Sequence, residues 1–256
     1  VLLLPEGVEG RFGTGVRQDG RNLIQEAKEA GFTIVYTAAE LAALDPLTEN
    51  KVLGVFGAYH TFNDEPEEKL KEDNLPLYNP GTPTLAEMTT FALEFLQTKG
   101  DTFFLVAEEE GSDNFANNNN AAGTLEALYR ADQSMGVVRE FIEDHPRTLL
   151  VTAADSNAGG ALIFPWTSAE EPLPETTYNG APADGPTGTG SLPFVSAPNQ
   201  FGETLPFAIA WSGYSDGMGG IIAKAHGLNA AMLPQNVQNT DIYRLMYATL
   251  FAEVLE

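Results

Sequence analysis

The residues of this chain that are best suited to chemistry are carboxylates that follow a short apolar run. Residues 103–107 read FFLVA, which has the length and bulk expected of a fully buried strand. Glu108 and Asp113 follow this run, and Asn117 is the first of four asparagines before a long helical pattern. Carboxylates at the end of a buried strand are unfavourable unless a cation lies among them. A cation site is therefore the sharper interpretation of this stretch.

The alternative interpretation is a solvated acidic loop whose asparagine caps the next helix. A second stretch of the same design favours the cation site. Residues 148–154 read TLLVTAA, which predicts another buried strand, and Asp155 and Ser156 follow it before a glycine turn. In open α/β sheets, ligands bind beyond the carboxyl ends of the parallel strands. We therefore expect Glu108, Asp113 and Asp155 to lie together.

The composition is that of a globular, strongly acidic chain. Its 256 residues suffice for one large α/β domain or two small ones. The net charge of −23 disfavours nucleic acid and anionic membranes as partners. The absence of cysteine excludes disulfides and thiolate metal sites and is compatible with an extracytoplasmic location. No apolar run approaches the length of a membrane span. Residues 1–4 read as a strand that begins at once without Met, so we expect the N-terminus to be incomplete.

Strand and helix patterns alternate along the chain, which predicts an α/β fold with a mainly parallel sheet. Between residues 165 and 200 the composition shifts to many prolines and glycines, which predicts an irregular insertion. The other predicted strands are residues 33–36, 51–57 and 205–211, and the predicted helices are residues 21–30, 38–44, 84–96, 121–142 and 241–254.

Side chains with oxygen donors are the candidate metal ligands that remain once histidine sites and a nucleotide-binding loop are considered. The three histidines, at positions 60, 145 and 226, have no metal-ligand spacing and are expected to be structural. The glycine-rich run at 185–190 lacks the flanking strand and helix of a nucleotide-binding loop. Oxygen-only sites favour Mg²⁺, Ca²⁺ or Mn²⁺ over zinc. The candidate donors are Glu108, Asp113, Asn117, Asp155, Ser156, and Ser215 or its neighbour Asp216.

The order of these motifs resembles that of the alkaline phosphatase family. AEEEGSDNFAN at 107–117 resembles the family segment V-E-G-x-x-I-D-x-x-x-H, and ADSNAGG at 154–160 resembles T-A-D-H-x-x-G-G. YSDG at 214–217 stands where the family has G-H-T-G, and NTDIYRLM at 239–246 matches N-T-D-I-x-x-L-M. The similarity covers essentially the whole chain in the right order.

The resemblance implies a three-layer α/β/α sandwich with a mainly parallel sheet. Residues 1–256 would form the C-terminal part of a single alkaline-phosphatase-like domain, with residues 165–200 as an irregular crown insertion. The family's nucleophilic serine, phosphate-binding arginine and first metal aspartate would lie upstream of Val1. No catalytic residue is therefore expected within this chain.

The resemblance also implies metal-binding roles. Glu108 matches the family's magnesium-site glutamate, Asp113 matches an aspartate of one zinc site, and Asp155 matches an aspartate of the other. The three histidine ligands of the family are replaced, by Asn117, Ser156 and Ser215. Divalent cations, with Mg²⁺ or Ca²⁺ favoured over Zn²⁺, are therefore expected as cofactors.

Two functions stay open. The first is a metal-dependent phosphomonoester hydrolase that acts on a phosphate monoester together with the missing N-terminal segment. Oxygen donors at the three replaced histidine positions favour this enzyme, because a metal site that has lost its function tends to acquire hydrophobic residues. The second is a non-catalytic secreted or surface structural or binding protein on the same fold, which the loss of every histidine ligand supports. A periplasmic or secreted location is expected, and a homodimer is compatible with the resemblance.

Overall fold

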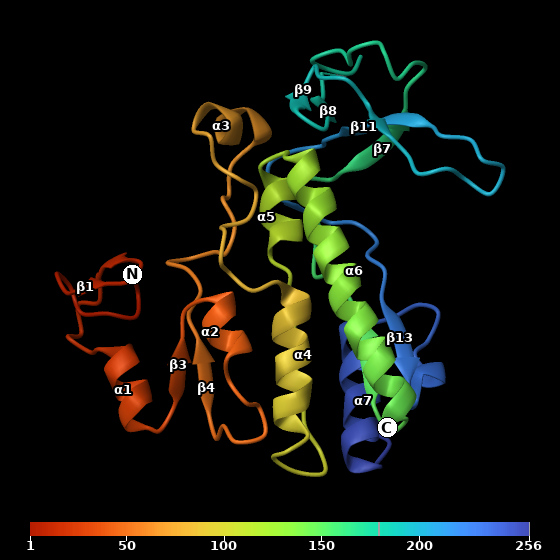
Figure 1. The fold of residues 1–256 in the computed structure, drawn as a ribbon. Helices are drawn as coiled ribbons and strands as arrows, with labels where there is room; N and C mark the ends of the chain where they lie inside the picture. Colours follow the sequence, from red (N-terminus) through yellow and green to blue (C-terminus); the bar gives the residue numbers. More distant parts are fainter. Residues whose placement is uncertain (179, 256) are drawn as a thin grey trace. The chain divides into compact units, whose positions relative to one another are not determined.

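A computed structural model describes residues 1–178 and 180–255, which divide into two compact units. Unit 1 comprises residues 1–63 and 75–107. Unit 2 comprises residues 64–74 and the chain from Glu108 onward. Figure 1 shows the elements of each unit along the chain. A single domain spanning the chain stays a prediction.

Unit 1 contains a parallel strand pair and three of the predicted helices. In the strand pair, Ile34 lies opposite Leu53, and α2 connects the two strands. The side chain of Thr84 accepts a hydrogen bond from the backbone of Glu87, and this capping box fixes the start of α4. The elements are β1 (Glu9–Gly10), β2 (Gly13–Thr14), α1 (Leu23–Glu29), β3 (Thr33–Val35), α2 (Ala38–Ala42), β4 (Val52–Gly54) and α4 (Leu85–Leu96).

Two predicted strands of unit 1 are wrong. Residues 1–4 and residues 103–107 are not assigned to any strand. Phe104 and Val106 are 58% and 73% exposed, so the apolar run is not buried on both faces. Its apolar composition indicated burial, but a strand also requires a neighbouring backbone to which it can hydrogen-bond. No strand of the described residues pairs with this run.

Unit 2 is built around one long helix and a five-stranded antiparallel sheet. In that sheet β11 pairs with β7, β8 and β10, and β9 pairs with β8. The long helix is α6, against which the short helix α5 packs (Figure 1). The elements are α3 (Glu67–Glu72), α5 (Gly111–Asn117), α6 (Ala121–Asp144), β5 (Leu149–Thr152), β6 (Asn157–Ala158), β7 (Leu162–Pro165), β8 (Ala183–Gly185), β9 (Gly188–Thr189), β10 (Phe194–Val195), β11 (Pro206–Ala210), β12 (Asp216–Gly217), β13 (Lys224–Gly227), the 3₁₀ helix η1 (Ala230–Met232) and α7 (Asn239–Phe251).

The core of unit 2 joins α5, the start of α6 and β11. Buried Ala116, Ala121, Ile209 and Trp211 form this core. Helix α6 begins at Asn120, whose side chain accepts a hydrogen bond from the backbone of Gly123 at 2.6 Å. The same short elements that carry the candidate site are therefore fixed by hydrophobic packing.

The fold class is α/β, but the mainly parallel sheet and the three layers are not confirmed. Among the named strands of the described residues, β3 and β4 form a parallel pair and the other pairs are antiparallel. The predicted strand at 148–154 is present as β5, but it pairs with β13 in an antiparallel ladder. The segment 165–200, predicted to be irregular, contains β8, β9 and β10, with the glycine-rich run at 185–190 at the turn between β8 and β9.

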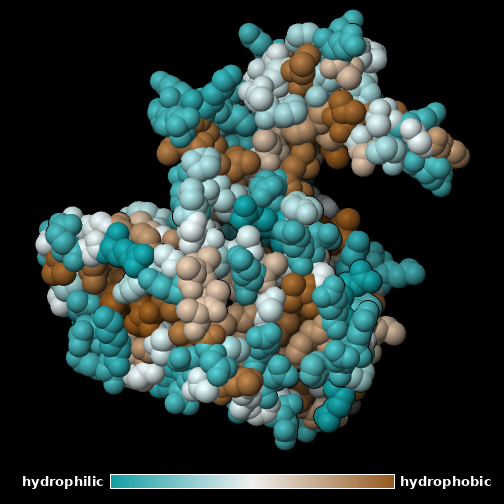
Figure 2. Space-filling view, viewed as in Figure 1, coloured by the Kyte–Doolittle hydropathy of each residue, from teal (hydrophilic) through white to brown (hydrophobic). Residues whose placement is uncertain are grey.

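The visible surface is largely hydrophilic, with scattered hydrophobic patches (Figure 2). This agrees with an excess of 36 acidic over 13 basic residues. Among the helices in the described part of the chain, none combines the length and apolar character that a membrane crossing requires.

Candidate metal centre

Helix α5 carries two of the predicted site residues on one face. Asp113 and Asn117 are four residues apart, which places them one helical turn from each other. On another face, Phe115 and Ala116 are 0% and 3% exposed and anchor the helix in the core. This short helix was not predicted from the sequence, in which the same residues were interpreted as part of a cation site or, alternatively, as a solvated acidic loop.

Four side chains from three segments converge beside α5, and we call them the Asp113 cluster: Asp113, Asn117, Ser156 and Asp216. The Asn117 amide nitrogen donates hydrogen bonds to the carboxylates of Asp113 at 3.0 Å and of Asp216 at 2.8 Å. The Ser156 hydroxyl donates to Asp113 at 3.3 Å. Asn117 thus links two carboxylates that lie far apart in the sequence.

The pairing of β6 with β12 and the glycine turn that follows β6 position Ser156 and Asp216 beside α5. Strand β6 pairs with β12, so Ala158 lies opposite Asp216. The Gly159 backbone nitrogen donates to the Asn117 amide oxygen at 3.0 Å. Gly159 has φ +63°, and a Cβ atom there would lie 2.1 Å from the carbonyl oxygen of Ala116. Only glycine lets this turn approach α5 so closely.

The electrostatics of the cluster are those of crowded carboxylates. Burial raises the pKa of Asp113, and the Asp216 carboxylate raises it further through its negative charge and a shared hydrogen bond. The hydroxyl of Ser156 acts in the opposite direction, and Asp155 adds a smaller repulsion. No Lys or Arg of the described residues forms an ion pair with Asp113 or Asp216. A cation at this position would favour the ionised carboxylates instead.

The predicted residues differ in how close they come to this cluster. Asp113, Asn117 and Ser156 are brought together by hydrogen bonds, whereas exposed Asp155 acts on Asp113 only through its charge. Glu108 is exposed and has no hydrogen bond or ion pair with a described residue. Ser215 contributes its backbone carbonyl, which accepts from Gly159 at 3.2 Å.

Asp216, the weaker alternative to Ser215 in the sequence, is the residue whose side chain joins the cluster. The signal that could have identified it is its place in a Ser-Asp-Gly sequence six residues after the buried end of β11 at Ala210. In the described residues, no group of three or more His, Cys, Asp or Glu side chains is placed to hold a metal ion. The Asp113 cluster itself contributes two carboxylates, those of Asp113 and Asp216.

The histidines have structural contacts of other kinds. The ring of His60 stacks on Phe62 with centroids 4.8 Å apart, and that of His145 stacks on Phe141 at 3.9 Å. His226 lies in strand β13 opposite Leu150. None of the three takes part in the hydrogen bonds described for the Asp113 cluster.

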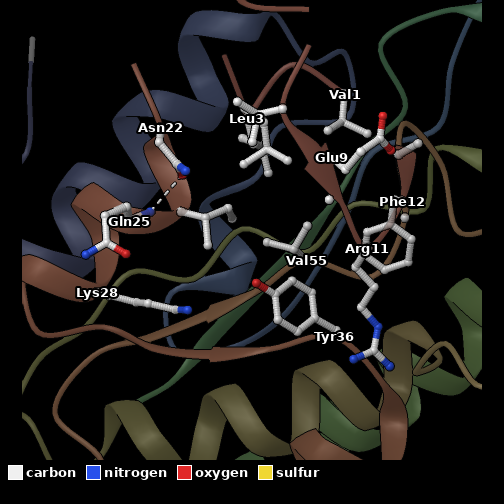
Figure 3. A pocket seen from close by; sticks show the side chains of 16 residues that line it. Val1, Leu3, Glu9, Arg11, Phe12, Asn22, Gln25, Lys28, Tyr36 and Val55 are labelled. Carbon is white, nitrogen blue, oxygen red and sulfur yellow. Dashed lines mark hydrogen bonds between the residues drawn. The ribbon is translucent and has the colours of Figure 1, made fainter. Parts of the chain in front are cut away.

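Unit 1 contains a separate cavity of about 210 Å³ (Figure 3). Its lining combines apolar side chains such as Leu3 and Val55 with Tyr36, Lys28 and Arg11. The Arg11 guanidinium lies 5.2 Å from the centre of the Tyr36 ring and pairs with Glu40 at 3.2 Å. None of the predicted site residues lines this cavity.

Comparison with known families identifies the broader relationship. The family model for alkaline phosphatase matches residues 5–169, more than half of the chain. The chain belongs to the alkaline phosphatase family. The matched region includes Asp113, Asn117, Asp155 and Ser156, whereas Asp216 lies beyond it.

Individual alkaline phosphatases and a related phosphatase show the same similarity. Alkaline phosphatase of Escherichia fergusonii is 29% identical over 164 residues, which cover 59% of this chain and 34% of that protein. Streptomycin-6-phosphate phosphatase of Streptomyces griseus is 31% identical over 156 residues, covering 53% of this chain and 33% of that protein. The chain thus matches about a third of the length of these relatives.

Solved alkaline phosphatases support the fold. A mutant of the enzyme from TAB5, with Mg bound, superposes with a TM-score of 0.60 at 17% identity. The alignment covers 91% of this chain and 56% of the TAB5 chain. The alkaline phosphatase from the Antarctic bacterium TAB5 gives a TM-score of 0.58 at 15% identity, with the same coverage. These similarities show an alkaline-phosphatase-like α/β fold.

The oxygen atoms of the Asp113 cluster are of the kind that bind a hard divalent cation. Two carboxylates and one hydroxyl offer oxygen ligands, which hard divalent cations prefer, whereas the Asn117 amide directs its nitrogen at the carboxylates. Mg²⁺ is commonly held by one or two carboxylates together with water and substrate phosphate. A site with two carboxylates is therefore sufficient for Mg²⁺, although it lacks the imidazole and thiolate groups typical of zinc.

Proposed function

We propose that the protein containing this chain is a phosphomonoester hydrolase and that the Asp113 cluster holds a divalent cation for it. The observation that carries the proposal is the convergence of Asp113 and Asp216 on Asn117, which is 99 residues before Asp216 in the sequence. Membership of the alkaline phosphatase family supports the reaction class. The chain covers about a third of its curated relatives, so the activity is proposed for the whole protein.

The roles of the cluster residues follow from their chemistry. Asp113 and Asp216 would supply the negative charge that holds the cation, and the Ser156 hydroxyl would be a further oxygen donor. Asn117 would position the two carboxylates through its amide nitrogen. When bound, the cation would offset the charge of a phosphate monoester and polarise its oxygens. Without it, this acidic surface would repel a phosphate dianion.

We infer that Mg²⁺ or Ca²⁺ is preferred to Zn²⁺. The inference is supported by the absence of imidazole from the cluster hydrogen bonds and by the Mg bound in a TAB5 neighbour structure. Asp155 is close enough to influence Asp113 by charge and is a further candidate ligand. Roles for Glu108 and Ser215 remain predictions, as does a periplasmic or secreted location.

Phosphate release from p-nitrophenyl phosphate tests the proposal. The full-length protein should turn over this ester in Mg²⁺ or Ca²⁺, lose activity in EDTA and gain nothing from added zinc. Asp113→Ala and Asp216→Ala should each lower kcat/KM by more than about 10- to 100-fold, which is the range found when residues that only orient metal ligands are replaced. Asp132→Ala, at an exposed position on α6, is the matched control and should leave activity unchanged.

Two results would contradict the proposal. One is unchanged turnover in both Asp113→Ala and Asp216→Ala, which would place the site elsewhere. The other is a folded full-length protein that binds Mg²⁺ or Ca²⁺ but releases no phosphate from any monoester. That second result would favour a non-catalytic relative on the same fold.

A further inference from the structure

Helix α5 needs support from outside itself to hold Asp113 and Asn117 in place. It has seven residues, and its N-cap residue, Glu110, makes no side-chain capping hydrogen bond. Its composition is rich in Gly, Ser, Asp and Asn, which have low helix propensity. Isolated helices of this length are unstable in water. Its orientation must therefore be set by tertiary contacts.

Asp64 supplies a polar contact of this kind. Its carboxylate accepts a hydrogen bond from the side-chain amide of Asn118 at 2.6 Å and another from that of Asn114 at 3.2 Å. Hydrogen bonds to an ionised acceptor are roughly twice as strong as those between neutral groups. One carboxylate thus holds two residues of α5 and its cap that lie one helical turn apart.

The residues after Asp64 contact the turn between α5 and α6 and the first residues of α6. The backbone carbonyl of Glu65 accepts from the Asn120 side chain at 2.8 Å, and the Glu67 carboxylate accepts from the backbone nitrogen of Ala122 at 3.0 Å. Asn120 is the N-cap of α6. The segment that begins at Asp64 therefore follows α5 into the start of α6 and fixes the turn between them.

The residues that Asp64 holds are direct neighbours of the cluster residues along α5. Asn114 follows Asp113, and Asn118 follows Asn117, so the pair bound to Asp64 forms the adjacent row on the helix surface. A rotation of α5 that released Asn114 and Asn118 would also move Asp113 and Asn117 away from Ser156 and Asp216. Small displacements of this kind weaken metal sites, whose ligands depend on surrounding hydrogen bonds for orientation.

We propose that Asp64 is a positioning residue for the Asp113 cluster, acting through Asn114 and Asn118 without touching the cation. This inference deepens the proposed function, because it depends on the Asp113 cluster being a cation site. Asp64 is not among the motif residues that the family resemblance identifies. Its acidic neighbours Glu65, Glu67 and Glu68 make it resemble an ordinary solvated charge run in the sequence.

The test compares Asp64→Ala with the conservative Asp64→Asn and with a control, Asp73→Asn. Asp73 lies in the same segment, residues 64–74, and pairs with Lys69. Mg²⁺ and Ca²⁺ binding to the full-length protein is measured by calorimetry. Hydrogen–deuterium exchange of residues 111–118 is measured without metal. Asp64→Ala should weaken cation affinity by about 10- to 100-fold, the range known for residues that orient ligands. Exchange in this helix should also accelerate. Asp64→Asn keeps one acceptor oxygen but faces the other amide with a donor, so its losses should be intermediate, and Asp73→Asn should leave both properties unchanged.

The two readouts separate this inference from the function on which it depends. A wild-type protein that binds no divalent cation would overturn the metal site, whereas the exchange data would still decide whether Asp64 orders α5. Wild-type cation affinity in a folded Asp64→Ala variant would overturn the positioning role. Exchange in residues 111–118 that is unchanged by Asp64→Ala would also overturn it.

Discussion

Glu67 is an ionisable side chain that is almost completely buried, with 8% of its surface exposed. One carboxylate oxygen accepts the hydrogen bond from Ala122, and the other has no partner among the described residues. Burial raises the pKa of Glu67 from its ordinary 4.5 to about 7, and the negative charges of Asp184 and Glu68 act in the same direction. Glu67 is therefore mainly protonated in the folded protein below about pH 7.

Replacing Glu67 with Gln should remove a pH-dependent loss of stability. The pKa is raised in the folded state, so the stabilising contribution of the proton is fully present below pH 4.5 and is lost as the pH rises through about 7. A shift of this size corresponds to about 3 kcal/mol at most. Urea unfolding at pH 5 and pH 8.5 should show that Glu67→Gln loses less free energy of unfolding than wild type over this interval.

The control for this experiment is Glu72→Gln, on the same short helix but exposed to solvent. It should follow the wild-type pH dependence, because its ion pair with Lys69 is exposed to solvent and such pairs contribute little to stability. Parallel pH profiles for wild type and Glu67→Gln would show that Glu67 is already ionised at neutral pH in the folded state.

At the scale of elements, the turn that follows β6 approaches α5 closely, and this approach depends on Gly159. Gly159→Ala would place a methyl group against the carbonyl of Ala116 and the ring of Trp211, in a backbone conformation that disfavours side chains. We expect a loss of about 2 kcal/mol or more in the free energy of unfolding, as for other strained backbone sites. Denaturant unfolding measures this loss.

Gly136 provides the opposite case within α6. A Cβ atom there meets nothing within 4 Å, and its backbone is helical. Gly136→Ala should therefore stabilise the protein by up to about 1 kcal/mol, the difference in helix propensity between the two residues. Equal effects of the two substitutions would contradict the steric account of Gly159.

Most helices could be predicted from the sequence, whereas strand pairing could not. Helices α4 and α6 have clear N-caps at Thr84 and Asn120 and long periodic patterns, and both are confirmed close to their predicted bounds. The run at 103–107 was predicted as a strand from its apolar composition, but composition does not reveal whether a partner strand is present. Helix α5 was missed because its low-propensity residues become helical only through contacts with the core and with Asp64.

At the scale of the whole molecule, the candidate site could be predicted in part. We predicted that Glu108, Asp113 and Asp155 lie together, with Asn117 and Ser156 as further candidate donors. The structure joins Asp113, Asn117 and Ser156 by hydrogen bonds, and these bonds include neither Glu108 nor Asp155. The reason for their convergence was wrong, since helix α5 and the β6 turn bring them together and the tips of parallel strands do not. Asp216 required the β6–β12 pairing, which local patterns do not specify.

The overall charge also favours a cation-dependent protein. With a net charge of −23, the chain offers an anionic substrate little attraction of its own. A divalent cation held between Asp113 and Asp216 would change the local field from repulsive to attractive for a phosphate group. The metal-binding claim is thus the one on which the proposed activity and the role of Asp64 both depend.

Calorimetric titration of the full-length protein with Mg²⁺ and Ca²⁺ tests that claim most directly, with Asp113→Ala and Asp132→Ala as the paired variants. We predict saturable binding in wild type and in Asp132→Ala, and its loss in Asp113→Ala. Binding that persists unchanged in a folded Asp113→Ala variant, or purified protein that carries stoichiometric zinc, would contradict the account.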